Sequence, residues 1–197
     1  MMDNNKNSKE NSIILTRYLR SLFRKAKKAT LGPDLSHRTT LVNSLSRDIE
    51  VRKEINRLSN GNPKLKKKLK KKAYKYANEI CSDINYPIIR LLMRGFNWFW
   101  NKRYEGINLN NLETIKKLSK DNSLVYVPCH RSHIDYCALQ YILVENDLMV
   151  AQIAAGNNLN IPIIGRILRG GGAVFMRRAF ASNSLYSTVF FRHMRSL

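Results

Sequence analysis

Two residues about two thirds of the way along the chain could carry acid–base chemistry. His130 comes shortly after an apolar run at 124–127, and Asp135 follows five positions later, where an apolar helix is expected to begin. Pro128 separates the run from the histidine, and because proline cannot donate to a β ladder, a strand is expected to end there. A carboxylate beside an imidazole holds one ring nitrogen protonated and leaves the other free to accept a proton. The spacing therefore indicates a general base, His130, with Asp135 as its orienting partner.

Other roles for these residues stay open. Negative charge in the first turn of a helix is favoured by the helix dipole, so Asp135 could serve the helix alone. His130 and His133 could instead bind a metal ion, but no Cys/His cluster elsewhere in the sequence completes a tetrahedral set. We therefore expect no metal site.

The segment around this pair resembles the first sequence block of the glycerolipid acyltransferases, and in particular the bacterial membrane-associated glycerol-3-phosphate acyltransferases. The spacing His130-x4-Asp135 lies within His-Arg-Ser-His-Ile-Asp-Tyr, although such a spacing alone is a weak signal. The resemblance runs from about Lys25 to the last residue. Further stretches match in order, and together they are highly specific: Leu-Gly-Pro-Asp-Leu-Ser-His-Arg at 31–38, Ile-Ala-Ala-Gly-Asn-Asn-Leu-Asn at 153–160, and Gly-Ala-Val-Phe-Met-Arg-Arg at 172–178.

The resemblance implies acyl transfer from acyl-CoA or acyl carrier protein to the sn-1 hydroxyl of glycerol 3-phosphate, the first step of phospholipid synthesis. In this reading His130 removes the hydroxyl proton, and Asp135 fixes the imidazole tautomer and stabilises the imidazolium. General base catalysis of this kind typically contributes on the order of 10²–10⁴ in rate. The resemblance implies no cofactor. No covalent acyl-enzyme is required, so Cys129 and Cys137 need not be nucleophiles.

The second block predicts where the acceptor phosphate binds. Gly172 ends a run of three glycines and opens an apolar strand that finishes in Arg177 and Arg178, and we expect these three residues to bind substrate. A guanidinium can donate two hydrogen bonds to a phosphate because its donors form a planar fork. The acceptor-binding arginine of the family falls on Arg178 in this spacing, and Arg177 is the weaker candidate. Two solvated arginines at a strand end are the alternative.

The charge of the chain predicts an anionic partner. Lysine and arginine total 35 against 14 acidic residues, and residues 1–106 hold 25 of the basic and 9 of the acidic side chains. An acidic membrane surface and nucleic acid both attract such charge. A lysine run at 64–72 suits lipid headgroups, where each lysine contributes about 1 kcal/mol, or it is simply solvated. Nucleic acid is not expected, since no helix-turn-helix or aromatic RNA-binding motif accompanies the charge.

An aromatic stretch suggests how a membrane could be contacted. Trp98, Phe99 and Trp100 stand beside basic residues and either lie at a membrane interface or pack the helical arm against the catalytic region. No apolar run approaches the roughly 20 residues of a membrane span, and residues 1–12 lack the core of a signal peptide. The three cysteines show no paired spacing, which suggests a reducing compartment. We expect a peripheral protein on the cytoplasmic side of the inner membrane.

Periodicity predicts an α/β fold, with a basic α-helical arm over 1–106 and a mixed or parallel α/β layer at 107–197. The resemblance implies that this layer is the first half of an acyltransferase catalytic domain. Helices are expected at 13–29, 36–58 and 63–84, and Gly95 weakens any single straight helix over 86–100. Beyond residue 107, strands alternate with helices, which favours parallel pairing. The expected strands are 124–127, 148–154 and 173–176, and the expected helices are 111–120, 134–144, 159–168 and 184–194.

The third and fourth blocks of the family do not follow Arg178. We therefore expect a truncated catalytic region, inactive by itself, with an exposed sheet edge that favours association. The alternatives are an inactive remnant, a fragment of a split enzyme completed by a C-terminal fragment, and a basic membrane- or nucleic-acid-binding module.

Overall fold

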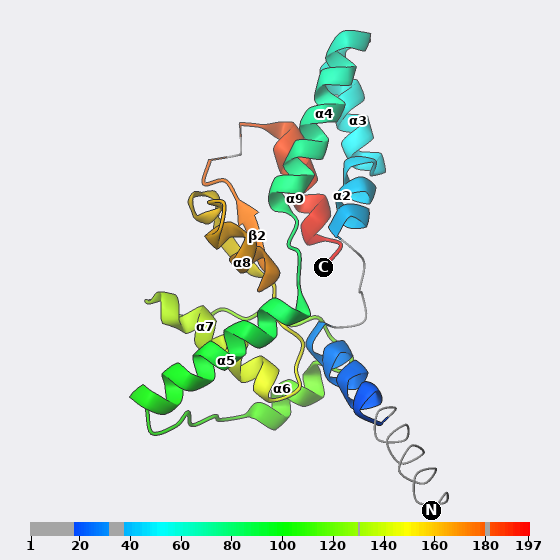
Figure 1. Ribbon diagram of the computed structural model, residues 1–197. Helices are drawn as coiled ribbons and strands as arrows, with labels where there is room; N and C mark the ends of the chain where they lie inside the picture. The colour runs from blue at the N-terminus through cyan, green and yellow to red at the C-terminus, as the bar shows by residue number, and fades with distance from the viewer. Residues whose placement is uncertain (1–17, 32–37, 130, 180–181) are drawn as a thin grey trace, which may run out of the picture. The chain divides into compact units, whose positions relative to one another are not determined.

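Two compact units make up the chain (Figure 1). A computed structural model describes residues 18–31, 38–129, 131–179 and 182–197. Unit 1 comprises Met1–Asp34 and Gly95–Val150, and unit 2 comprises Leu35–Arg94 and Ala151–Leu197. Each unit draws on separate parts of the sequence. The predicted boundary after residue 106 stays a prediction, because these units follow spatial contacts rather than the order of the chain.

Four helices pack side by side in unit 2, namely α2 (Arg38–Ser46), α3 (Ile49–Ser59), α4 (Pro63–Ile80) and α9 (Ser184–Met194) (Figure 1). Helix α9 coincides with the helix predicted at 184–194. Helix α4 starts where Asn62 accepts a hydrogen bond from the Leu65 backbone N–H at 3.1 Å. Helix α4 packs against both α9 and strand β2.

The single helix predicted over 36–58 was wrong, because α2 and α3 are separated at Arg47 and Asp48. The Asp48 side chain accepts a hydrogen bond from the Glu50 N–H at 2.8 Å and so caps the start of α3. Aspartate competes for the backbone in this way and favours helix starts over helix interiors.

The core of unit 2 is apolar and joins these helices to the sheet. Its largest fully buried side chains include Tyr186, Ile55 and Ile80. The N-terminal half of α4 extends beyond this core, because its buried residues all lie between Ala73 and Ile80. The core cluster comprises Val42, Leu45, Val51, Ile55, Ala73, Tyr76, Ala77, Ile80, Cys81, Val174, Leu185, Tyr186, Val189 and Phe190.

The sheet of unit 2 has two parallel strands, β1 (Ile153–Gly156) and β2 (Ala173–Met176), paired from Ile153↔Ala173 to Gly156↔Met176. Between them lie the 3₁₀ helix η1 (Asn157–Leu159) and α8 (Ile164–Gly170), and α8 packs on β2. The predicted strand 173–176 and the parallel pairing are confirmed. The helix predicted at 159–168 starts later, because Pro162 disfavours helical backbone in the residue before it.

Strand β1 begins five residues later than predicted. The backbone N–H of Leu148 donates to Leu143 O and that of Val150 donates to Thr30 O, each at 2.9 Å. Both residues are buried in unit 1. Their donors are therefore used within unit 1, and the strand starts only at Ile153.

Unit 1 is helical in its described residues. It contains residues 18–31, the part of α5 (Tyr86–Arg103) from Gly95 onward, α6 (Leu112–Leu118) and α7 (His133–Glu145). Gly95 does not interrupt α5. The strand predicted at 124–127 was wrong: Val125 and Val127 are each 88% exposed, and no neighbouring strand in the described part of unit 1 offers a ladder.

The fold is thus mostly helical with a small parallel sheet, which confirms the predicted α/β class for the described residues. Trp100 is buried, and its ring lies 6.4 Å from that of Tyr141 on α7, so it packs inside unit 1. Trp98 is 66% exposed. The aromatic stretch therefore divides between packing and exposure. Among the described residues no helix combines the length and apolar character needed to cross a membrane.

Candidate active site

Asp135, the described member of the predicted acid–base pair, lies in unit 1 at the start of α7. His130 and the side chain of His133 lie outside the described parts of the chain. Asp135 occupies the first turn of α7, as predicted, and completes a capping box: its Oδ2 accepts the Ser132 N–H at 2.9 Å, while Ser132 Oγ accepts the Ile134 N–H at 3.2 Å. Among the described residues, Oδ1 of Asp135 has no hydrogen-bond partner.

This capping box fixes the carboxylate at the point where the loop enters the helix. The cap explains Asp135 as a helix residue and leaves one oxygen for a further donor, so the two interpretations of Asp135 are compatible. The pairing of Asp135 with His130 stays a prediction.

The cysteines near this loop differ in exposure. Cys129 is exposed, whereas Cys137 on α7 is half-buried and burial raises the pKa of its thiol. A raised pKa leaves less thiolate at neutral pH, which disfavours Cys137 as a nucleophile. Within the described ranges, histidine, cysteine and acidic side chains form no group of three or more that could hold a metal ion.

The predicted acceptor residues belong to unit 2, around the ends of the sheet. Gly156 and Met176 are paired at the carboxyl ends of β1 and β2, so Asn157 and Arg177 follow at the same edge. Ligands of parallel sheets generally bind outside the carboxyl ends of the strands. This edge of the sheet is therefore the part of unit 2 where a ligand is expected.

Gly172 lies at the opposite, amino end of β2. It is buried with φ +102°, a left-handed conformation that favours glycine, and its carbonyl accepts the Ile153 N–H at 2.9 Å. Gly172 thus starts the pairing of the two strands. A direct contact of Gly172 with substrate stays a prediction.

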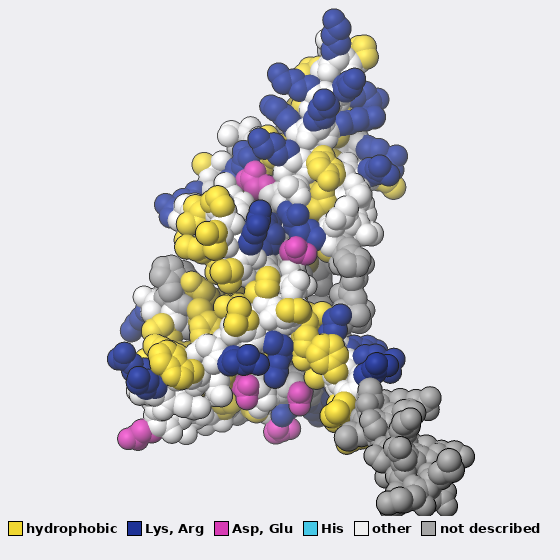
Figure 2. Space-filling view, viewed as in Figure 1, with side chains coloured by type: hydrophobic (Ala, Val, Ile, Leu, Met, Phe, Trp, Pro, Cys, Tyr) yellow, Lys and Arg dark blue, Asp and Glu magenta, His cyan; other side chains and the backbone are white. Residues whose placement is uncertain are grey.

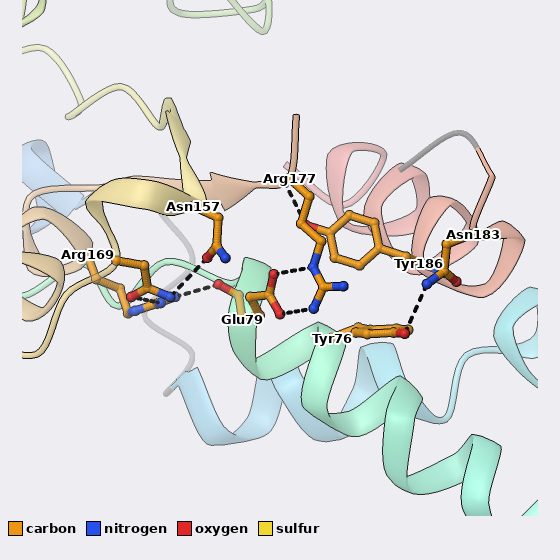
Figure 3. Close-up of polar contacts among 8 residues, drawn as sticks. Tyr76, Glu79, Asn157, Arg169, Arg177, Asn183 and Tyr186 are labelled. Carbon is orange, nitrogen blue, oxygen red and sulfur yellow. Dashed lines mark hydrogen bonds and ion pairs between the residues drawn. The ribbon is translucent and has the colours of Figure 1, made fainter. Parts of the chain in front are cut away.

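Arg177 is held by a carboxylate of α4 (Figure 3). Its Nε and Nη2 donate to Oε1 and Oε2 of Glu79, both at 2.7 Å, which is a bidentate pair. This pair raises the pKa of the Arg177 guanidinium above its usual range. The backbone N–H of Arg177 also donates to Tyr186 Oη at 3.2 Å.

Arg178 has the opposite environment. It is exposed in the bend that follows β2, and its side chain has no hydrogen bond or ion pair with any described residue. The two adjacent arginines are therefore distinguished by structure: Arg177 is occupied and Arg178 is available to an anionic ligand.

Glu79 and its neighbours were not identified from the sequence. Asn183 Nδ2 donates to Tyr76 Oη at 3.0 Å, and the rings of Tyr76 and Tyr186 meet edge to face at 5.2 Å (Figure 3). One signal was present in the sequence. Glu79 is the only acidic residue of lysine-rich α4 and stands in its last turn, where the helix dipole disfavours negative charge.

Two further arginines, Arg169 and Arg38, also reach the last turn of α4. Arg169 of α8 donates to Glu79 O at 3.0 Å, to Cys81 O and to Asn160 Oδ1 at 3.0 Å. Arg38, which ends the matching stretch 31–38, donates to Asn78 O and to Cys81 O. Burial lowers the pKa of Arg169. Cations are favoured at a helix C-terminus. Through these arginines and Arg177, the last turn of α4 contacts α2, α8 and the end of β2.

Comparison with known proteins gives one family and a set of longer relatives. Residues 106–195 match the acyltransferase family. The chain is 50% identical over 184 residues to a glycerol-3-phosphate acyltransferase of Pseudomonas aeruginosa (strain UCBPP-PA14), covering 93% of this chain and 22% of that protein. It is 45% identical over 197 residues to a protein of the same name from Pseudomonas fluorescens (strain SBW25), covering 100% of this chain and 24% of that protein. The chain spans less than a quarter of the length of these relatives.

Proposed function

Because residues 106–195 match the acyltransferase family, we propose that this chain supplies the general base and the acceptor-phosphate arginine of a glycerol-3-phosphate acyltransferase. The observation that carries the proposal is the identity of 45–50% to proteins of that name over 93–100% of this chain. The environment of Arg178 supports it independently. Its exposed guanidinium has no partner among the described residues, whereas the adjacent Arg177 is already paired with Glu79.

The proposed reaction begins with acceptor binding. Arg178 donates two hydrogen bonds to the phosphate of glycerol 3-phosphate, and charge-assisted hydrogen bonds of this kind contribute about 1.5–3 kcal/mol each. Arg177 contributes indirectly, since Glu79 already occupies its guanidinium.

Proton transfer and acyl transfer follow. His130 takes the proton of the sn-1 hydroxyl as the oxygen attacks the thioester carbonyl of acyl-CoA or acyl carrier protein. The C–S bond breaks, the new ester forms, and the imidazolium returns its proton to the departing thiolate. Asp135 holds the imidazole in the required tautomer through Oδ1 while Oδ2 stays in the helix cap.

Attachment to an anionic membrane surface is part of the proposal. The half of α4 that extends beyond the core carries Lys64, Lys67, Lys68, Lys70, Lys71 and Lys72, all exposed. Figure 2 shows lysine and arginine side chains crowded over this helix. Each lysine near an anionic surface contributes about 1 kcal/mol. The same observation favours a second candidate function, a basic module that binds anionic surfaces without catalysis.

A hybrid enzyme tests the proposal. The 184 aligned residues of the P. aeruginosa relative are replaced by those of this chain, and formation of 1-acylglycerol 3-phosphate is measured from glycerol 3-phosphate and acyl-CoA. We expect an active hybrid whose activity requires Arg178. A matched control replaces the exposed Arg103 by alanine and should keep the activity. A folded hybrid without activity would contradict the enzyme proposal and leave the binding module.

A further inference from the structure

Glu79 stands in the last turn of α4 and joins that helix to the end of β2. Its side chain is only 12% exposed, and both of its oxygens accept hydrogen bonds from Arg177 at 2.7 Å. We propose that Glu79 is a positioning residue for the acceptor-binding Arg178 and acts through Arg177. This inference rests on the proposed function, because it takes Arg178 as the group that binds the acceptor phosphate.

Arg177 is fixed on three sides. Its guanidinium carbon lies 5.0 Å from the ring centroid of Tyr76 and 4.9 Å from that of Tyr186, which are cation–π distances (Figure 3). Its backbone N–H donates to Tyr186 Oη. Asn183 holds Tyr76 in turn and caps α9 by accepting the Tyr186 N–H at 3.1 Å. Both the side chain and the backbone of Arg177 are therefore held in place.

Holding Arg177 restricts the backbone of the next residue. Bidentate recognition of a phosphate requires a guanidinium in a defined plane, and a displacement of about 1 Å at such a group can cost on the order of a hundredfold in rate. The Glu79 carboxylate also occupies two donors of Arg177 and compensates its positive charge, so that Arg178 alone meets the phosphate. Glu79 therefore sets the affinity for glycerol 3-phosphate and takes no part in proton transfer.

Kinetics in the hybrid enzyme separate this role from a general effect on folding. Glu79→Gln should raise KM for glycerol 3-phosphate about tenfold and leave kcat and the KM for acyl-CoA within about twofold. The matched control is Glu54→Gln on α3, which removes a bidentate pair with Arg57 of 2.7 and 2.8 Å. The control should leave KM for glycerol 3-phosphate unchanged.

A double-mutant cycle tests whether Glu79 acts through the acceptor arginine. In an Arg178→Ala background, Glu79→Gln should change KM by less than about twofold, because coupled residues are not additive. A tenfold effect that recurs in this background would overturn the proposal. An unchanged KM in the Glu79→Gln variant would also overturn the proposal. A lower KM would overturn it as well, because it would mean that the released Arg177 binds the phosphate.

Amide hydrogen exchange in the 197-residue chain gives a readout that needs no activity. Glu79→Gln should speed exchange of the Arg177 N–H about tenfold and leave the exchange rates of the β2 amides unchanged. In the Glu54→Gln control, all of these amides should keep their original rates. Unchanged exchange at Arg177 would overturn the positioning role. An inactive hybrid together with faster exchange at Arg177 would count against the proposed function. It would still support the inference that Glu79 holds Arg177 in place.

Discussion

Arg177 and Arg178 are adjacent in sequence but differ in what holds them. Arg177 pairs with Glu79 and lies against two tyrosine rings, whereas Arg178 is exposed. Substitutions of Arg177 and of Arg178 should therefore have different effects on the stability of the fold.

Stability measurements should separate the two arginines. Arg177→Ala leaves the largely buried Glu79 carboxylate without its partner, and we expect the free energy of unfolding to fall by about 2–3 kcal/mol. Arg178→Ala should change it by less than about 0.5 kcal/mol, as for most surface substitutions. Urea unfolding followed by circular dichroism measures both. Equal losses in the two variants would contradict the assignment.

Glu54 should make stability depend on pH in acid. The side-chain hydrogen bond from Arg57 is the main reason that the pKa of Glu54 is lowered from 4.5 to about 2, against the opposing effect of burial. A lowered pKa in the folded state means that the stabilisation is complete above pH 4.5 and is lost as the pH falls towards 2. The difference in stability between wild type and Glu54→Gln, measured by thermal unfolding, should therefore shrink as the pH falls from 4.5 towards 2. A difference in stability that stays constant from pH 6 to pH 2 would contradict the pairing.

At the scale of elements, Asp48 determines where α3 begins. Its side chain caps the helix and also accepts a hydrogen bond from Arg192 Nη2 of α9 at 2.8 Å. Replacing an N-cap aspartate by alanine costs about 0.5–2 kcal/mol, and loss of the contact with α9 puts Asp48→Ala near the upper end. Urea unfolding measures the loss. Asp121→Ala, at an exposed turn, is the control, and a similar effect there would contradict a specific role for the cap.

The elements that could be predicted from the sequence are those with local causes. Strand β2 and helices α7 and α9 have apolar patterns and start signals within their own residues, and they form where expected. The strand at 124–127 failed because a strand also needs a partner, which local sequence does not specify. The late start of β1 has the same kind of cause, since Val150 donates to Thr30, 120 positions earlier along the chain.

In the candidate site, too, only the residues with partners nearby in the sequence could be predicted. Asp135 could be placed at a helix start because its cap partner, Ser132, is three residues away. Glu79 could not be connected with Arg177 from the sequence, because 98 positions separate them and only the packing of α4 on β2 brings them together. The resemblance predicts that Arg178 binds the acceptor, and the structure shows that Arg178 is exposed whereas Arg177 is paired with Glu79.

For the whole molecule, the net charge of +21 should favour binding to anionic membrane surfaces. The protein should bind vesicles of phosphatidylglycerol and phosphatidylcholine and dissociate as salt rises, because screening weakens each lysine contact. Removing three exposed lysines of α4 as Lys67→Gln, Lys68→Gln and Lys71→Gln should weaken binding about a hundredfold, at about 1 kcal/mol each. Vesicle co-sedimentation measures the affinity.

A triple variant with the same loss of charge provides the control for vesicle binding. Lys116→Gln, Lys117→Gln and Lys120→Gln change lysines in and just after α6 and should weaken binding much less. Equal losses in the two triple variants would mean that only net charge matters. Binding to neutral vesicles of similar strength would contradict an electrostatic surface on α4.

If this chain supplies the base for acyl transfer to glycerol 3-phosphate, the initial rate of the hybrid enzyme must depend on His130. His130→Ala should lower kcat by on the order of 10²–10⁴ while the circular dichroism spectrum and the KM for glycerol 3-phosphate stay close to those of the unmodified hybrid. A His130→Ala hybrid that forms 1-acylglycerol 3-phosphate at nearly the original rate would contradict the claim.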